Sequence, residues 1–90
     1  MARLDEVIFV DNLPKLDLHG LDRNAARMYI NDFIKDNIIM KNEFVLIVYG
    51  NGEGVLREVT HKCLSQNNHV IDHKILYYNS GCTLVQLKIE

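Results

Sequence analysis

Polar and apolar positions in the first half of the chain predict a strand, a helix and a buried strand. Residues 15–19 (KLDLH) alternate with period two, which is typical of a half-buried strand, and Gly20 ends it. Asp22 can cap a helix that runs to about Met40, because an apolar face recurs at spacings of three and four. That face consists of Ala26, Ile30, Phe33, Ile34 and Ile38. Residues 43–49 form a nearly continuous apolar run, which indicates a strand buried on both faces.

The second half predicts a loop, a helix and two more strands. Residues 50–54 (GNGEG) hold three glycines in five positions and must form a loop. A second helix follows and ends at Asn67 and Asn68; its apolar positions are Val55, Leu56, Val59, Cys63 and Leu64. Ile71 to Tyr77 is a third strand, Asn79-Ser80-Gly81 has turn composition, and Thr83 to Ile89 alternates as a fourth strand.

This element order, β-α-β-α-β-β, predicts an α/β fold of two layers. Strand–helix–strand connections imply parallel pairing, and the short final turn implies an antiparallel hairpin. Two amphipathic helices can cover one face of a mixed four-stranded sheet, so we expect the other face to be open. Residues 15–90 would form the domain, and residues 1–14 an arm or edge strand that Pro14 separates from it.

Composition narrows the class of protein. The 90 residues carry 10 Lys and Arg against 12 Asp and Glu, a formal charge of −2, and 48% are apolar, as in a globular domain. This charge argues against nucleic-acid binding by bulk electrostatics. Two cysteines favour a reducing compartment. Acidic residues near the N-terminus and the absence of a long apolar run favour a cytoplasmic protein without a membrane segment.

Asp17 and His19 form the first candidate site. Because these residues are two positions apart on a strand, their side chains would point to the same face of the sheet. They lie at the carboxyl end of that strand, where open α/β sheets bind ligands. A carboxylate can orient an imidazole, and a positioned histidine can transfer a proton near neutral pH. The alternative is that Asp17 only faces solvent and His19 only shapes the turn into Gly20.

The glycine-rich loop is the second candidate site. Gly50, Asn51, Gly52 and Gly54 precede a helix N-terminus, where backbone N–H groups and the helix dipole favour an anion, and Arg57 could reach a phosphate there. The loop lacks the Gly-Lys-Ser/Thr ending of a Walker A motif. The alternative is a tight turn that needs positive φ. If the two strands are parallel neighbours, both sites converge on one phosphodiester.

Three ordered motifs resemble the Smr (small MutS-related) domain family. They are LDLHG at residues 16–20, VYGNGEGVLR at residues 48–57, and GCTLVQL at residues 81–87. The resemblance spans roughly residues 15–90. It implies a two-layer α/β fold similar to the C-terminal domain of translation initiation factor three. It also implies kinship with DNA-nicking endonucleases, with endonucleases that cut RNA under stalled ribosomes, and with domains fused to a MutS-like ATPase.

Carried over by position, the resemblance links Asp17 and His19 to cleavage. It links Gly50 and Gly52 to substrate binding, together with the basic residue Arg57. Tyr49 departs from the family pattern, which has histidine there, and a phenol with a pKa of about 10 is a poor base at pH 7. Tyr49 would either stack on a base or pack beside the loop.

The predicted function is therefore an endonuclease that nicks RNA or DNA, acting as a monomer. The alternative is a non-catalytic module that binds nucleic acid or the ribosome; Tyr49 and the acidic balance favour it. With RNA, the 2′-OH can attack and no cofactor is required. With DNA, a water must attack, usually with a divalent metal such as magnesium or manganese. Beyond nucleic acid, the ribosome or a larger MutS-like protein are the candidate partners.

The remaining chemistry-bearing residues have structural interpretations. Cys63 lies on the apolar helix face and belongs to the core. The other histidines, His61, His69 and His73, are dispersed along the chain and predicted to be surface residues that form no zinc site. A modest basic rim is expected from Lys15, Arg23, Arg27 and Lys35, unless these residues are simply a solvated helix face.

Overall fold

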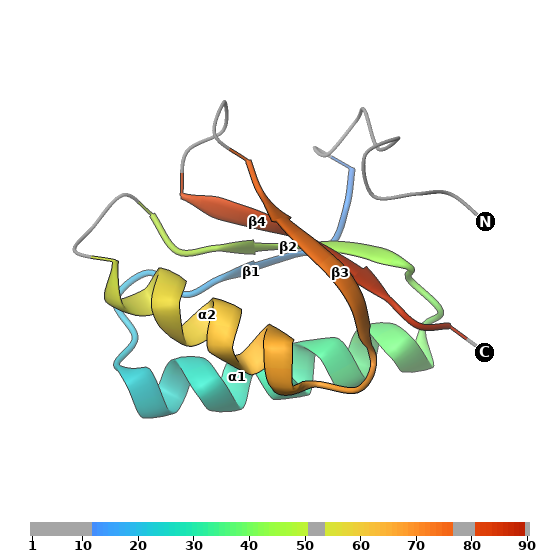
Figure 1. Cartoon of the computed structure of the whole chain (residues 1–90), viewed down its shortest axis with the longest axis horizontal. Coiled ribbons are helices and arrows are strands. Elements are labelled where there is room, and N and C mark those ends of the chain that lie inside the picture. Colours follow the sequence, from blue (N-terminus) through green and yellow to red (C-terminus); the bar gives the residue numbers. More distant parts are fainter. Residues whose placement is uncertain (1–11, 51–53, 77–80, 90) are drawn as a thin grey trace.

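The elements follow one another as the hydrophobic pattern predicts. The computed structural model describes residues 12–50, 54–76 and 81–89, so most of the predicted arm lies outside the described residues. Within these ranges, four strands and two helices alternate as β1 (Lys15–Asp17), α1 (Arg23–Ile39), β2 (Phe44–Val48), α2 (Val55–Gln66), β3 (Val70–Ile75) and β4 (Cys82–Leu87) (Figure 1). The α/β class is confirmed.

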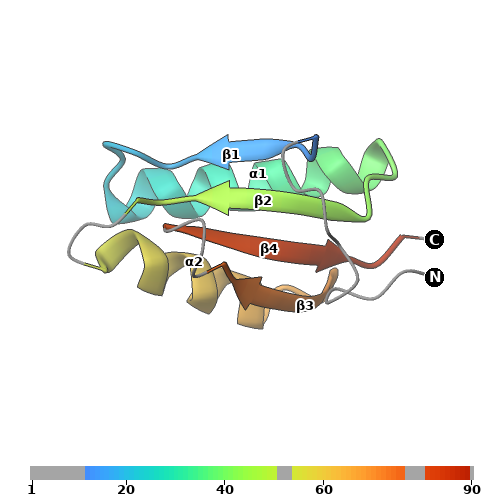
Figure 2. The same cartoon turned by 90° about the horizontal axis from the view of Figure 1, so that it is seen from above.

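The strands form a mixed sheet in the order β1-β2-β4-β3 (Figure 2). β1 and β2 pair in parallel, with Asp17 opposite Val48. β4 pairs antiparallel with both β2 and β3, so the predicted hairpin is present and its second strand lies between β2 and β3. The carboxyl ends of β1 and β2 consequently lie at the same end of the sheet. The candidate site residues of the sequence analysis follow these two strand ends.

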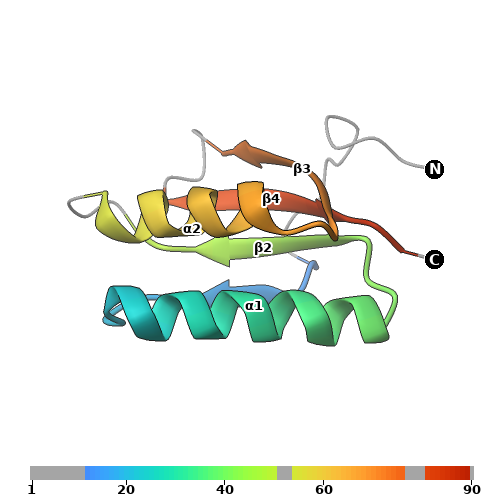
Figure 3. The same cartoon turned by 60° about the horizontal axis from the view of Figure 1, so that its bottom comes forward.

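Helix α1 begins and ends where its sequence predicts. The Asp22 carboxylate accepts a hydrogen bond from the Ala25 backbone N–H at 2.8 Å, and Met40 is the C-terminal cap. Lys41 follows with a φ of 60°, a left-handed residue that turns the chain toward β2. Both helices lie on one face of the sheet, side by side (Figure 3). The two-layer architecture is therefore confirmed.

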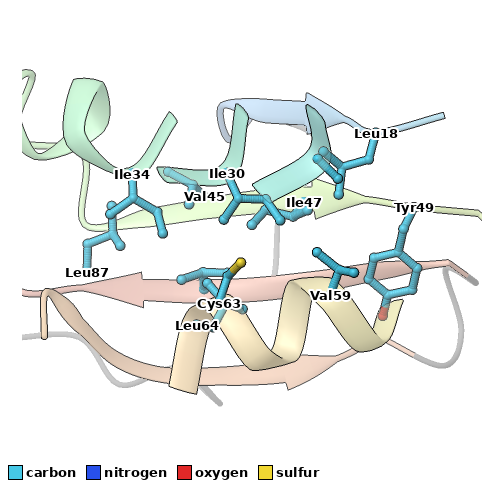
Figure 4. Close-up of a cluster of buried hydrophobic side chains, with 12 residues drawn as sticks. Leu18, Ile30, Ile34, Val45, Ile47, Tyr49, Val59, Cys63, Leu64 and Leu87 are labelled. Atoms are coloured by element: carbon cyan, nitrogen blue, oxygen red, sulfur yellow. The ribbon is translucent and has the colours of Figure 1, made fainter. Parts of the chain in front are cut away.

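The main core lies between the helices and the sheet (Figure 4). Leu18, which follows β1, is completely buried there, and Leu16 packs against the same cluster. Cys63 belongs to this core, as predicted. The other members that are at most 1% exposed are Ala26, Ile30, Ile34, Val45, Ile47, Leu64, Val85 and Leu87.

The opposite face of the sheet carries a second apolar cluster, and our expectation of an open face is wrong at its centre. Leu46 and Leu84 are only 1% and 2% exposed, and Cys82 and Leu76 are buried beside them. The remaining apolar neighbours are Leu13, Phe44 and Val48. Because the apolar run of β2 is continuous, it places large side chains on both faces, and both must be removed from water. The centre of this face is therefore buried and is not the open sheet surface that we expected.

Candidate functional site at the carboxyl ends of strands β1 and β2

Parallel pairing brings the LDLHG segment and the start of the glycine-rich loop to one edge. The Leu18 backbone N–H donates to the Val48 carbonyl at 2.8 Å, which extends the pairing one residue beyond β1. The turn that follows β1 and the two residues that follow β2, Tyr49 and Gly50, therefore leave the sheet side by side (Figure 2). The expected juxtaposition of the two segments is present in the fold.

Asp17 holds the turn that presents His19. Its Oδ1 accepts the backbone N–H of His19 at 2.9 Å, and the Leu21 N–H closes the turn on the Leu18 carbonyl at 3.0 Å. Both side chains are exposed. We expected His19 to lie on the strand, but β1 ends at Asp17, because the chain turns here toward α1 through Gly20. The alternation of polar and apolar positions therefore does not extend the strand to His19. The Asp17 carboxylate contacts the backbone of His19.

The glycine-rich loop begins and ends in left-handed backbone. Gly50 has a φ of 82° and Gly54, the cap residue of α2, a φ of 87°. Such backbone favours glycine, as the tight-turn interpretation requires. The Gly50 N–H donates to the Gly81 carbonyl at 3.0 Å, so this N–H is already used within the protein. The predicted phosphate contacts of Asn51 and Gly52 lie outside the described residues.

Gly81 contacts the first residue of this loop, a contact that the sequence analysis did not predict. Its carbonyl accepts the N–H groups of Tyr49 and Gly50, at 2.7 and 3.0 Å. A Cβ on Gly81 would lie 2.6 Å from the Cα and the carbonyl carbon of Gly50. The start of β4 therefore fixes the first residue of the loop by backbone contact.

Arg57 is exposed in the first turn of α2, and its guanidinium lies back toward the loop. Nη2 is 3.4 Å from the position that a Cβ on Gly54 would occupy. Its positive charge is thus available at the end of the glycine-rich loop, as predicted. An arginine in this place can bind a phosphate oxygen with two N–H groups.

Tyr49 packs beneath the loop, which is the second of its two predicted alternatives. The side chain is only 7% exposed, and its hydroxyl shares a hydrogen bond with Thr83 Oγ1 at 2.8 Å. The ring points from the end of β2 into the helix-facing core (Figure 4). So little exposed surface does not suit stacking with a nucleic-acid base.

His61 and His73 are not dispersed surface residues, and that prediction is wrong. Their rings stack with centroids 5.4 Å apart and 29° between planes, and His61 Nε2 hydrogen-bonds with Thr83 Oγ1 at 3.1 Å. Burial lowers the pKa of His61, and the charges of His73 and Arg57 lower it further. In the sequence, the local signal for the contact between these side chains is the four-residue spacing of Arg57 and His61, which places both on one face of a helix.

The predicted basic rim is exposed, and Arg27 also contacts the core. Lys15, Arg23, Arg27 and Lys35 all face solvent. Burial raises the pKa of the Cys63 thiol, and the charge of Arg27 with its hydrogen bond opposes this in part.

Among the described residues, no group of three His, Cys, Asp or Glu side chains could hold a metal ion. Nor is either described helix long and apolar enough to cross a bilayer.

Sheet order, helix placement and paired glycine-ended turns together define a class of two-layer α/β domain in which β1 and β2 end side by side. In comparisons with known structures, the Smr domain of Thermus thermophilus MutS2 superposes with a TM-score of 0.80 and 20% identity, covering 83% of this chain and 98% of that one. YdaL, a stand-alone small MutS-related protein from Escherichia coli, gives a TM-score of 0.77 at 20% identity, covering 82% and 63%.

The sequence matches the Smr domain family over residues 16–88, and the chain belongs to this family. It is 32% identical over 76 residues to an endonuclease MutS2 of Clostridium perfringens, covering 84% of this chain. It is 31% identical over 81 residues to the endonuclease MutS2 of Alkaliphilus metalliredigens, covering 87%. The chain spans about a tenth of the length of these relatives.

Proposed function

We propose that this Smr domain is an endonuclease that nicks nucleic acid by phosphodiester cleavage at the carboxyl ends of β1 and β2. The observation that carries the proposal is the parallel pairing of Asp17 with Val48, which sets the His19 turn beside the glycine-rich loop. Similarity to endonuclease MutS2 supports nucleic acid as the ligand class. An exposed imidazole after β1, together with an exposed arginine at the end of the glycine-rich loop after β2, suits a phosphodiester.

In this proposal His19 is the proton-transfer group and Asp17 positions it. The hydrogen bond from the His19 N–H to Asp17 Oδ1 restrains the turn, so the imidazole is presented from a defined backbone. Arg57 neutralises phosphate charge at the start of α2. Gly50 and Gly54 give the loop its left-handed ends. Asn51 and Gly52 are proposed to contribute to phosphate binding.

Single-stranded RNA is the substrate that these residues can cleave by themselves. The 2′-OH attacks the adjacent phosphorus while His19 takes its proton, the phosphorus–5′-oxygen bond breaks, and the leaving 5′-oxygen takes a proton from water, which gives a 2′,3′-cyclic phosphate and a 5′-hydroxyl. Cleavage of DNA would instead use an attacking water and a divalent metal. Among the residues that the structure describes, no three His, Cys, Asp or Glu side chains are grouped so that they could hold such a metal.

The test compares wild type, His19→Ala and His69→Ala on labelled single-stranded RNA and on supercoiled plasmid, with and without EDTA. His69 is an exposed histidine at the far end of α2, so its variant is the matched control. We expect His19→Ala to cleave RNA about 100-fold more slowly or worse, with His69→Ala unchanged and EDTA without effect. Equal rates for wild type and His19→Ala would refute the role of His19.

The second candidate function is nucleic-acid or ribosome binding without cleavage. The buried Tyr49 favours it, because the loop position that carries histidine in the family pattern here holds a phenol bonded to Thr83. In that case wild type would bind labelled RNA and leave it intact, with or without magnesium. A larger MutS-like partner or the ribosome would then bring the domain, proposed to act as a monomer, to its target.

A further inference from the structure

Three groups that carry or can take positive charge lie on α2 and β3, and they extend from Arg57 of the site described above. Arg57 and His61 are one helical turn apart on α2, and His73 of β3 stacks on His61 with centroids 5.4 Å apart. Both imidazoles are half-buried, and Arg57 is exposed. We name Arg57, His61 and His73 the basic cluster.

Two exposed acids adjoin the basic cluster in sequence: Glu58, three residues before His61 on α2, and Asp72, next to His73 on β3. The Asp72 carboxylate accepts the backbone N–H of His73 at 2.8 Å. The groups that contact or electrostatically affect His61 are Arg57 on its own helix, His73 from β3, Tyr49 from the end of β2 and Thr83 from β4. The pKa of His61 is lowered by burial and by the positive charges of His73 and Arg57. Protonation of His61 therefore adds positive charge beside Arg57 and His73, which oppose it.

The cluster continues from the glycine-rich loop. Arg57 Nη2 lies against Gly54, and His61 Nε2 bonds Thr83, whose partners in the sheet are Ile47 of β2 and Ile75 of β3. Thr83 thus lies near the carboxyl ends of both strands. A strand of nucleic acid with one phosphate at the loop would find its next positive charges along α2 toward β3.

We propose that His61 and His73 bind a second phosphate of the nucleic-acid backbone, adjacent to the phosphate at the glycine-rich loop, with Arg57 shared between the two phosphates. This inference rests on the proposed function, because it takes the substrate to be nucleic acid. A phosphate is the ligand that relieves the mutual repulsion of the cluster, and it accepts hydrogen bonds from both a guanidinium and an imidazolium. Binding then takes up protons, so affinity rises as the pH falls toward 6.

The test measures binding of a labelled 2′-O-methyl RNA oligonucleotide, which lacks the attacking hydroxyl, and of DNA with the same sequence. Wild type, His61→Gln/His73→Gln and His69→Gln are compared by fluorescence anisotropy between about pH 6 and pH 8 at several salt concentrations. Glutamine keeps a polar group within reach of Thr83, and His69→Gln is the matched control. Circular dichroism verifies the fold of each variant.

At about pH 6 the double variant is expected to bind about tenfold more weakly than wild type and His69→Gln, as for one lost charge-assisted hydrogen bond. Its salt slope should fall by about 0.7 for the lost phosphate contact, and the difference should shrink toward pH 8. If the double variant has the same affinity and the same salt slope as wild type, this inference is overturned and the proposed function is not. If wild type binds neither oligonucleotide at any pH, the proposed function fails as well.

Should the double variant fail to fold, His73→Gln decides the matter. His73 lies on the edge strand β3 and is not part of the buried apolar clusters. This variant must lose affinity at about pH 6 relative to His69→Gln, because one of the two imidazoles is gone. No loss would overturn the inference.

Discussion

Replacing Gly81 by alanine should destabilise the domain more than replacing Gly20 by alanine, although both residues have nearly the same backbone. Their φ angles are 82° and 81°. Left-handed backbone costs a residue with a Cβ roughly 1–2 kcal/mol, and the reduced freedom of the unfolded chain is common to both variants. The backbone conformation therefore predicts equal effects, and any difference comes from the surroundings of the new methyl group.

The surroundings differ sharply. Nothing lies within 4 Å of a Cβ on Gly20, whereas a Cβ on Gly81 would lie 2.6 Å from the Cα and the carbonyl carbon of Gly50. Carbon atoms in contact are normally about 3.5–4.0 Å apart, so the backbone at Gly50 must move by roughly 1 Å. Overpacking of this kind costs about 1–3 kcal/mol. We expect a total loss of about 1–2 kcal/mol for Gly20→Ala and about 2–5 kcal/mol for Gly81→Ala.

Urea unfolding followed by circular dichroism measures both variants. For a small domain, m is about 1–3 kcal/mol/M, so the extra 1–3 kcal/mol should lower the midpoint of Gly81→Ala by about 1 M relative to Gly20→Ala. The melting temperature should fall by about 4–8 °C for each kcal/mol. Equal losses in the two variants would refute the close contact between the start of β4 and the glycine-rich loop.

Three further predictions concern buried polar groups and thiols. Tyr49→Phe removes the hydroxyl bonded to Thr83 and should cost about 1 kcal/mol in urea unfolding; a neutral result would contradict that bond. The pKa of His61 is lowered by burial, so the folded state binds fewer protons than the unfolded state. This contribution to stability is lost as the pH falls through 6.5, and His61→Gln should show a smaller drop in urea midpoint between pH 8 and pH 5.5 than wild type. Burial raises the pKa of the Cys63 and Cys82 thiols, so both should react with Ellman's reagent at pH 8 far more slowly than in urea. Rapid reaction of the folded protein would contradict their burial.

Local sequence signals predict the elements of this fold well. The cap at Asp22 and the spacing of its apolar positions set the bounds of α1, because both effects act within one or two helical turns. The continuous apolar run predicts that β2 is buried on both faces, and this holds. The same run already argued against an open sheet face, since large apolar side chains on both faces of a central strand require cover on both sides.

Contacts between distant segments could not be predicted in the same way. His61 and His73 meet because α2 packs beneath β3, and Tyr49 meets Thr83 because β4 inserts beside β2. Neither pair has a characteristic spacing in the sequence. The motifs predicted which residues follow the carboxyl ends of β1 and β2. They did not predict that β1 ends at Asp17, because this depends on the turn toward α1. That turn brings the His19 backbone N–H to the Asp17 carboxylate.

The most direct test of the account is a titration of the isotope-labelled protein with a 2′-O-methyl RNA oligonucleotide, followed by amide chemical shifts. We expect the largest changes at the turn after β1, at Gly50 and Gly54, and in the first turn of α2. The opposite edge of the sheet, around Asn42 and His69, should change little. Changes confined to that opposite edge, or to the exposed outer surface of α1, would contradict a nucleic-acid site at the carboxyl ends of β1 and β2.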